Sequence, residues 1–342
     1  MCKSFKLEQT APCQDHRLVL FNCWKDYNSL GVASTIDARA YCEHSSSCIP
    51  MDTSANVNQS AKYGSFMFAD QLSLDHGAFG ISPAEARSMD PQQNLVLSVG
   101  YSALRQGDDS LSSINSNIGV FVGLEASGLK GRKEEASVYS ASGGALSVTS
   151  GRLSYSLGLV GPCYSIDTAC ASSLSALHAC VITLKAGECK QGVGIGTKVL
   201  SEAVNTANSV AGMLSPLGRC HTFDQRADGY CRGEGCGAFL LQSTTATGIN
   251  ILGSAVQQDG PSASLTAPNG SSQRRLIESV SRAITDTKDG TSLEAHGTGT
   301  ALGDPIEVCY YLVSIQQRFC ICRWELPFAH FALNQRMYSA RL

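Results

Sequence analysis

The stretch YSIDTACASSL, residues 164–174, places a cysteine in a position suited to covalent chemistry. A short strand is predicted to end just before it, so that a helix begins near Cys170. At a helix N-terminus, unpaired N–H groups and the helix dipole favour thiolate over thiol and lower the pKa. The N–H of Cys170 would form half of an oxyanion hole, and the small Ala169 and Ala171 leave room for an acyl group. The pattern fits acyl transfer through a thioester; the alternative is a buried structural cysteine.

A second candidate lies in EAHGTGTALGDPIE, residues 294–307. His296 follows a short extended segment and precedes a Gly/Thr turn that exposes it. A neutral imidazole beside a thioester can donate a hydrogen bond to a carbonyl or shuttle a proton. Taken alone, His296 is better explained as a loop histidine with satisfied hydrogen bonds. Together with Cys170 it becomes a candidate catalytic residue.

Other chemistry-bearing patterns are weaker. The stretches GEGCG (233–237) and GTGTALG (297–303) are glycine-rich, but neither fits G-x-G-x-x-G between a strand and a helix. No G-x-S-x-G serine elbow is found, which argues against a serine acyltransferase or hydrolase. No metal site is expected, because the spacing of four possible ligands fits no common zinc pattern. These four are Cys220, His221, Cys231 and Cys236.

Composition limits the class of protein. The 342 residues carry a net charge of −3 with scattered Lys and Arg, so neither nucleic acid nor an anionic membrane is expected as a partner. The 15 cysteines lack the spacing of a disulfide framework. We therefore expect most of them to be reduced and buried, in a cytoplasmic protein, with a plastid location as the alternative. No membrane span is expected, because no apolar run of about 18 residues was found.

Helices and strands are predicted to alternate over residues 61–303, which favours a layered α/β fold. Capping boxes begin two helices at Ser82 and Asp90. Leu97, Tyr101 and Leu104 share a face of the second helix, and Leu174, Leu177, Val181 and Leu184 share a face of the helix that runs from Cys170 to Gly187. Strands are predicted at 117–123, 163–166, 192–200, 237–243 and 250–258, and further helices within 143–159 and near 271–284.

Five stretches, in order and at sensible separations, resemble one known family. They are FGISPAEARSMDPQQ (79–93), GRLSY (151–155), GPCYSIDTACASSL (161–174), GRCHTFDQRADGYCRGEGCG (218–237) and EAHGTGTALGDPIE (294–307). Together they resemble the β-ketoacyl synthase (ketosynthase) domain of polyketide synthases, which is related to fatty-acid condensing enzymes. The resemblance divides the chain into a poorly matched segment (1–60), an N-terminal half with the nucleophile (61–246), a partial C-terminal half (247–308) and an atypical glycine-free tail (309–342).

The resemblance implies a thiolase-like fold, with α/β/α/β/α layers and a homodimer. It implies that Cys170 accepts an acyl chain from an acyl carrier protein or CoA thioester. A malonyl-type extender then loses carbon dioxide and attacks the acyl thioester. The site residues are expected as follows: His296 stabilises the enolate, Thr298 and Thr300 contact the pantetheine arm, and Asp304 and Glu307 form a supporting polar shell. No cofactor is expected to be bound, since phosphopantetheine is carried by the partner acyl carrier protein.

The sequence departs from the family pattern in several places. Ala171 stands where these synthases often have serine, and residues 1–60 lack the family's N-terminal signature. The Lys-x-Asn-x-Gly-His motif, which supplies a second catalytic histidine, and the Gly-Phe-Gly-Gly-Thr-Asn segment are not found. Without that lysine, a buried Glu307 is expected to be an uncompensated charge that costs several kcal/mol, unless it is exposed or protonated. A truncated second half is expected to lower stability or to cause aggregation. The alternative function is an inactive or self-acylating subunit that binds carrier protein.

Overall fold

The computed structural model describes residues 5–7, 60–67, 72–107, 116–128, 137–243, 249–281 and 295–314. Most of segment 1–60 and of tail 309–342, with the expectations attached to them, lies outside these residues. The chain divides into two compact units. Unit 1 comprises Met1–Gly31, Met67–Val199 and Gly235–Leu252, and unit 2 comprises Val32–Phe66, Leu200–Glu234 and Gly253–Leu342.

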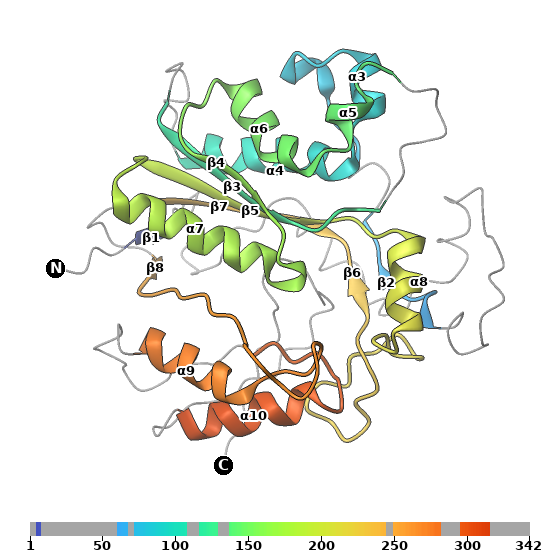
Figure 1. The fold of residues 1–342 in the computed structure, drawn as a ribbon. Coiled ribbons are helices and arrows are strands. Elements are labelled where there is room, and N and C mark those ends of the chain that lie inside the picture. The colour runs from blue at the N-terminus through green and yellow to red at the C-terminus, as the bar shows by residue number, and fades with distance from the viewer. Residues whose placement is uncertain are drawn as a thin grey trace, which may run out of the picture. The chain divides into compact units, whose positions relative to one another are not determined.

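Unit 1 contains a six-stranded sheet in the order β4-β3-β5-β7-β1-β8 (Figure 1). The central strand β3 pairs in parallel with β4 and β5, whereas the pairs β5–β7, β7–β1 and β1–β8 are antiparallel. The bounds are β1 (Phe5–Leu7), β3 (Ile118–Leu124), β4 (Cys163–Ile166), β5 (Gln191–Lys198), β7 (Gly235–Ser243) and β8 (Ile249–Ile251). Four of the five predicted strands are therefore confirmed closely, and the fifth is much shorter than predicted.

Helices cover both faces of this sheet (Figure 1). Helix α7 (Ser172–Ala186) lies on one face, and α4 (Pro91–Gly107) and α6 (Leu146–Leu157) lie on the other. Shorter elements of the same unit are η2 (His76–Phe79), α3 (Pro83–Ser88), α5 (Ser140–Gly143) and η3 (Ala169–Ala171). Strand β3 is buried along its whole length, as expected for a parallel strand between two helical layers.

The core between α7 and the sheet is centred on Phe121 of β3. Val181 and Leu184 of α7 are buried against it, and Leu177 packs at its edge. Leu174 does not join them, because its side chain remains 49% exposed, so the predicted apolar stripe is wrong at its first position. Gly187 ends α7 with a φ of 77°, the left-handed conformation that glycine adopts without steric cost.

Among the described residues, one segment, Ala169–Ala186, is long and apolar enough to cross a membrane by length and composition. It was not expected from the sequence. The segment includes α7, whose buried side chains pack on the sheet beside Phe121. A core helix with such a face meets the same criterion, so this feature by itself is weak support for a membrane span.

The predicted caps are present at the starts of α3 and α4. Ser82 Oγ accepts a hydrogen bond from the N–H of Glu85 (3.2 Å), and Asp90 Oδ1 accepts one from Gln92 (2.8 Å). The Glu85 carboxylate does not return to the N–H of Ser82 as a full capping box requires. It accepts instead from Arg152 Nη1 of α6 (2.6 Å) and thereby connects α3 to α6.

Replacing Arg152 with methionine is expected to lower the free energy of unfolding by about 2–3 kcal/mol. Arg152 is 8% exposed, and its Nε also donates to Oε1 of buried Gln93 (2.7 Å), so the change leaves two acceptors without this donor. The measurement is the urea midpoint. Arg274→Met is the matched control, because Arg274 and Glu278 form an exposed pair (48% and 39% exposed) worth about 0.5 kcal/mol or less. Equal midpoint shifts for the two variants would contradict this assignment.

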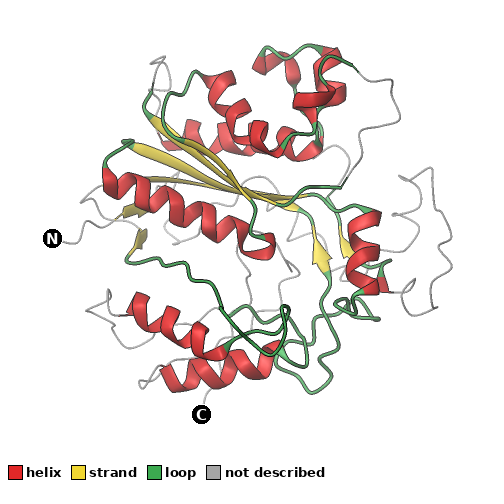
Figure 2. Cartoon of the chain, viewed as in Figure 1, coloured by secondary structure: helices red, strands yellow, loops and turns green. Residues whose placement is uncertain are grey.

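In unit 2, the described residues form short strands and helices that are joined by loops (Figure 2). Strand β2 (Gly64–Ser65) pairs in parallel with β6 (Arg232–Gly233), and the helices are α8 (Glu202–Val210), α9 (Gly270–Ser281) and α10 (Gly303–Ser314). Buried Asn205 connects α8 to the segment before β2 and to β6. Its Nδ2 donates to the carbonyl of Ala61 (2.8 Å), and its Oδ1 accepts from Arg232 (3.4 Å). Helices α9 and α10 lie against each other.

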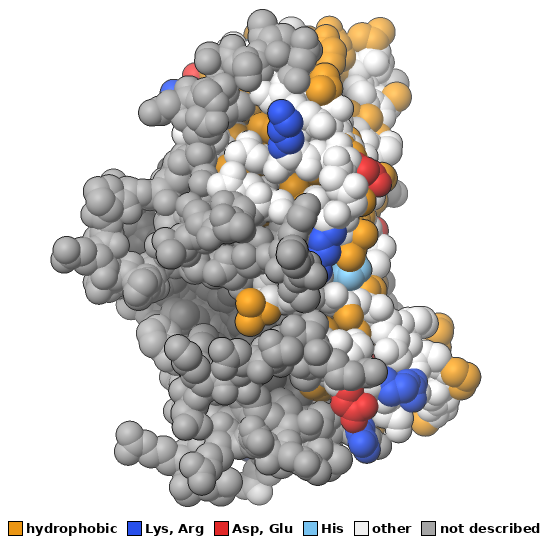
Figure 3. Space-filling view, turned by 90° about the vertical axis from the view of Figure 1, so that its left-hand side faces the viewer, with side chains coloured by type: hydrophobic (Ala, Val, Ile, Leu, Met, Phe, Trp, Pro, Cys, Tyr) orange, Lys and Arg blue, Asp and Glu red, His pale blue; other side chains and the backbone are white. Residues whose placement is uncertain are grey.

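The charged side chains of the described residues are dispersed on the face shown in Figure 3. Lys and Arg side chains lie apart from one another, one of them beside an acidic side chain, and on that face the described residues form no continuous basic stripe. This arrangement agrees with the scattered basic residues of the sequence.

Candidate active site

Cys170 lies in the turn between strand β4 and helix α7, within the short helix η3 (Ala169–Ala171). The predicted strand 163–166 and the helix start near Cys170 are both confirmed. The residue before the cysteine, Ala169, has a φ of +52°, in the left-handed region that disfavours a side chain. Cys170 is exposed and free. The backbone therefore turns sharply just before it presents an accessible thiol.

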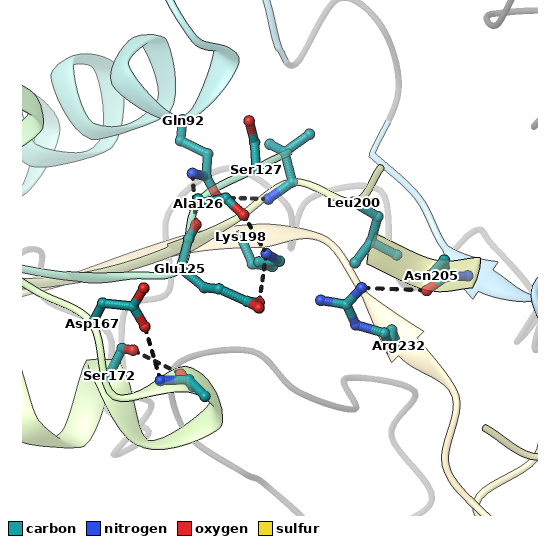
Figure 4. Close-up of polar contacts among 12 residues, drawn as sticks. Gln92, Glu125, Ala126, Ser127, Asp167, Ser172, Lys198, Leu200, Asn205 and Arg232 are labelled. Atoms are coloured by element: carbon teal, nitrogen blue, oxygen red, sulfur yellow. Dashed lines mark hydrogen bonds and ion pairs between the residues drawn. The ribbon is translucent and has the colours of Figure 1, made fainter. Parts of the chain in front are cut away.

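Two side chains hold this turn (Figure 4). Asp167 Oδ1 accepts a hydrogen bond from the N–H of Ala169 (3.0 Å). Ser172 Oγ accepts from the N–H of Thr168 (2.8 Å) and donates to the carbonyl of Ala169 (2.7 Å). Sequence reasoning missed both roles, although an Asp two residues before the turn is a recognised signal for such a side-chain bond.

Strand β3 passes directly under the turn at Gly123. A Cβ at this position would lie 2.3 Å from the carbonyl oxygen of Ser172 and 2.5 Å from Cα of Ser173. Only glycine allows the start of α7 to approach the strand this closely. Gly123 thus allows a short distance between the sheet and the turn that contains Cys170.

The expected lowering of the thiol pKa is wrong in its net direction. Burial raises the pKa of Cys170 above its ordinary value, while the N–H groups of Cys170 and Ala171 lower it and the nearby carboxylate of Glu125 raises it. The helix-terminal donors are present as expected, but protein atoms packed around the sulfur displace part of its water although the residue keeps an exposed surface, and this desolvation outweighs the donors.

Iodoacetamide reacts only with the thiolate, so the alkylation rate of a cysteine reaches half of its maximum at the pH equal to its pKa. For Cys170 this midpoint should lie at higher pH than for a small cysteine peptide. The rate is measured from the mass of the peptide that contains Cys170. A Glu125→Gln variant is expected to move the midpoint to lower pH, because it removes the like charge. A midpoint below that of the free peptide would contradict a raised pKa for this thiol.

Lys198 and Glu125 form an ion pair that the sequence did not reveal. Lys198 lies at the end of β5, is 9% exposed, and its Nζ contacts Glu125 Oε2 (2.7 Å) and the carbonyl of Ala126 (3.2 Å; Figure 4). Glu125 directly follows β3, which is parallel to β5, so both residues lie at the same edge of the sheet. The alternation of residues along one strand does not predict this ion pair, because the ion pair depends on the register between β3 and β5.

The second group of candidates lies in unit 2, where residues 296–303 form a loop before α10. Two carboxylates of α10 hold this loop. Glu307 accepts from the N–H of His296 and from that of Gly297 (2.7 Å). Asp304 Oδ1 accepts from the N–H of Gly299 (3.0 Å) and from Thr298 Oγ1 (3.4 Å). Asp304 lies in the first turn of α10, where its carboxylate also complements the helix dipole.

Glu307 is buried, at 6% exposed, but the expectation that it would be an uncompensated charge is wrong. Both carboxylate oxygens accept backbone N–H groups, from His296 and Gly297. Such bonds stabilise an ionised carboxylate without a lysine. The loop itself supplies the compensation that was expected from a basic side chain.

Asp304 also connects the loop to residues 222–229. Its Oδ2 accepts from the N–H of Phe223 (2.6 Å), and Thr222 Oγ1 donates to the carbonyl of Gly297 (2.7 Å). Phe223 has a φ of +56°; it and Ala169 are the two non-glycine residues with positive φ in the described part of the chain. Sequence reasoning did not single out Thr222 or Phe223, since neither residue type marks a turn.

His296 keeps an exposed surface at the start of this loop. Burial of part of the residue lowers the pKa of His296, and Asp304 partly opposes the change. A lowered pKa favours the neutral imidazole, which is a form that can donate a hydrogen bond to a carbonyl. The hydroxyls of Thr298 and Thr300 lie 2.9 Å apart, and Thr300 Oγ1 accepts from the N–H of Gly303 (3.1 Å) at the start of α10.

The structure thus brings His296, Thr298, Thr300, Asp304 and Glu307 together in one loop and its supporting helix. Cys170 belongs to unit 1, with a turn built from its own neighbours. Within the described residues there is no group of three or more His, Cys, Asp or Glu side chains placed to bind a metal. Cys220 instead accepts a hydrogen bond at its Sγ from the N–H of Cys231 (3.2 Å).

Comparison with known proteins identifies the family. Residues 43–246 match the β-ketoacyl synthase N-terminal domain, and residues 249–318 match the C-terminal domain. Erythronolide synthase EryA3 of Saccharopolyspora erythraea is 42% identical over 273 residues, which are 76% of this chain and 9% of that protein. The polyketide synthase Pks15/1 for phenolphthiocerol synthesis of Mycobacterium marinum is 40% identical over 267 residues, 75% of this chain and 13% of that protein.

Solved structures agree with this match. The ketosynthase from module 6 of the bacillaene synthase of Bacillus subtilis 168 superposes with a TM-score of 0.65 and 32% identity, over 73% of this chain and 45% of that one. The expected thiolase-like α/β fold is thereby confirmed. The chain spans about a tenth of the curated relatives and less than half of the solved ketosynthase. The chain belongs to the β-ketoacyl synthase family.

Proposed function

We propose that the chain takes part in polyketide-type chain elongation, with Cys170 as the residue that holds the acyl chain. One observation carries this proposal: an exposed thiol follows a left-handed Ala169 at the start of α7, in a turn held by side-chain hydrogen bonds. This arrangement suits a nucleophile, because it fixes the thiol beside backbone N–H groups that can bind an oxyanion. Family membership makes acyl transfer the chemistry to test.

In the first step, the Cys170 thiol gives up its proton to solvent, and the resulting thiolate attacks the carbonyl carbon of an acyl thioester. The new S–C bond forms, the old S–C bond breaks, and the departing thiolate takes a proton. The N–H of Cys170 supplies one donor to the oxygen that becomes negative during the attack. The carrier thiol is that of phosphopantetheine on an acyl carrier protein, so the chain itself needs no bound cofactor.

In the second step, a malonyl-type thioester loses carbon dioxide, and the electrons of the broken C–C bond form an enolate. The enolate carbon attacks the acyl carbon on Cys170, and the thiolate of Cys170 leaves. His296, whose lowered pKa favours the neutral imidazole, is suited to donate a hydrogen bond to the enolate oxygen. Thr298 and Thr300 are proposed to contact the pantetheine arm, with Asp304 and Glu307 holding their loop.

The partners follow from the same proposal. Several relatives are polyketide synthases by name, including those for erythronolide and phenolphthiocerol. We propose an acyl carrier protein and acyl and malonyl thioesters as partners, and a homodimer as the assembly. The alternative function, a self-acylating subunit that binds carrier protein without condensation, differs only in the second step.

The test separates these two steps. Purified chain is incubated with an acyl pantetheine thioester and then with malonyl pantetheine thioester, and carbon dioxide and β-ketoacyl product are quantified. The proposal predicts both products in the wild type, loss of the β-ketoacyl product in Cys170→Ala, and a fall of about 10²–10⁴-fold in the rates of formation of both products in His296→Ala. Cys309→Ser is the control, since Cys309 is also exposed and free but is expected to have no role. Acylation without carbon dioxide release would favour the self-acylating alternative.

A further inference from the structure

Ala169 is held at both of its backbone polar groups. Its N–H donates to Asp167 Oδ1 (3.0 Å), and its carbonyl accepts from Ser172 Oγ (2.7 Å). Neither Asp167 nor Ser172 is required by the chemical steps of acyl transfer and condensation. Their common feature is that they bind the residue directly before the nucleophile.

The conformation they hold is one that alanine avoids. At a φ of +52°, the Cβ of Ala169 is crowded by the backbone, and this region is disfavoured for alanine by roughly tenfold. Without the two side-chain hydrogen bonds, Ala169 would lower its free energy by relaxing to negative φ. That relaxation would turn the start of α7 and with it the direction of the Cys170 side chain.

We propose that Asp167 and Ser172 are positioning residues that hold Ala169 in the left-handed conformation and so fix the direction from which Cys170 Sγ meets an acyl thioester. The inference deepens the proposed function and rests on it. Asp167 is exposed, so its removal leaves the core unchanged. Ser172 is buried, at 3% exposed, directly over Gly123, which anchors the pair to the sheet.

Three variants test the role of Asp167. Asp167→Ala removes the acceptor and should lower the rate constant for acylation of Cys170 by an acyl pantetheine thioester about tenfold. Asp167→Asn keeps a carbonyl oxygen at the same position and should stay within about twofold of the wild type. The double variant Ala169→Gly with Asp167→Ala should recover most of the rate, because glycine adopts positive φ without the side-chain bond.

The control is Asp75→Ala, which removes a similar carboxylate bond to the N–H of Ala78 (3.4 Å) at η2. Asp75→Ala should leave the acylation rate unchanged. All of the variants should have urea midpoints close to that of the wild type, because substitutions of exposed residues change stability by about 0.5 kcal/mol or less. A merely structural Asp167 would not be rescued by glycine at position 169. Failure of that rescue, or equal rates for Asp167→Ala and the wild type, would overturn the proposal. A wild-type chain that stays unacylated would instead overturn the proposed function itself.

Discussion

Replacing Gly123 with alanine should destabilise the chain by about 3 kcal/mol or more and abolish acylation of Cys170. The added Cβ would lie 2.3 Å from the carbonyl oxygen of Ser172, far inside van der Waals contact. The obstacle is backbone rather than a flexible side chain, so either β3 or the start of α7 must move. Because Cys170 lies just before α7, the substitution should disturb both the fold and the candidate site.

Gly151→Ala provides the matched control for this result. Gly151 lies inside α6, and no neighbouring atom comes within 4 Å of a Cβ built there. Alanine in a helix interior is expected to stabilise by about 0.5–1 kcal/mol relative to glycine. Urea unfolding followed by circular dichroism measures both variants. A wild-type midpoint for Gly123→Ala would contradict the close approach of α7 to β3.

Replacing Asp304 with alanine is the second large change, with an expected loss of about 3 kcal/mol or more. Asp304 is 3% exposed and accepts from the N–H groups of Phe223 (2.6 Å) and Gly299 (3.0 Å) and from Thr298 Oγ1. The substitution leaves the buried N–H of Gly299 and the partly buried N–H of Phe223 without this acceptor. The loop that carries His296 should therefore loosen, which lowers stability and any activity that depends on the imidazole.

Two measurements test the expected effects of Asp304→Ala. The urea midpoint should fall, and amide hydrogen exchange at Phe223 and Gly299 should become faster than in the wild type, because both amides lose the same acceptor. Asp75→Ala is again a suitable control, with an expected cost of about 1 kcal/mol or less for its exposed cap. Unchanged exchange at Gly299 would mean that the loop does not depend on Asp304.

The sequence was sufficient to predict the elements around Cys170 because each has a local cause. The strand at 163–166, the helix that ends at Gly187, and the caps at Ser82 and Asp90 depend on residues a few positions apart. The five motifs then led to the family, which the matches to both ketosynthase domains confirm. Local pattern and motif order thus sufficed for the fold class, and the roles of the candidate residues stay predictions.

Features that depend on distant neighbours were missed or mistaken. The thiol pKa was expected to fall, because the sequence shows the helix start but not the protein that desolvates Cys170. Leu174 fits the spacing of an apolar stripe, but it stays exposed and does not join the core cluster around Phe121. Glu307 was expected to need a lysine, whereas the backbone of His296 and Gly297 binds it. Each of these depends on which groups the fold places nearby.

The most direct measurement of the role of Cys170 is the position of the acyl group after incubation with an acyl pantetheine thioester. The chain is digested, and the mass of every cysteine-containing peptide is determined. We expect the acyl mass to appear on the peptide with Cys170, to be removed by hydroxylamine as a thioester, and to be missing from Cys170→Ala. Acyl mass on other cysteines with none on Cys170, under conditions in which a complete ketosynthase is labelled, would contradict Cys170 as the acyl acceptor.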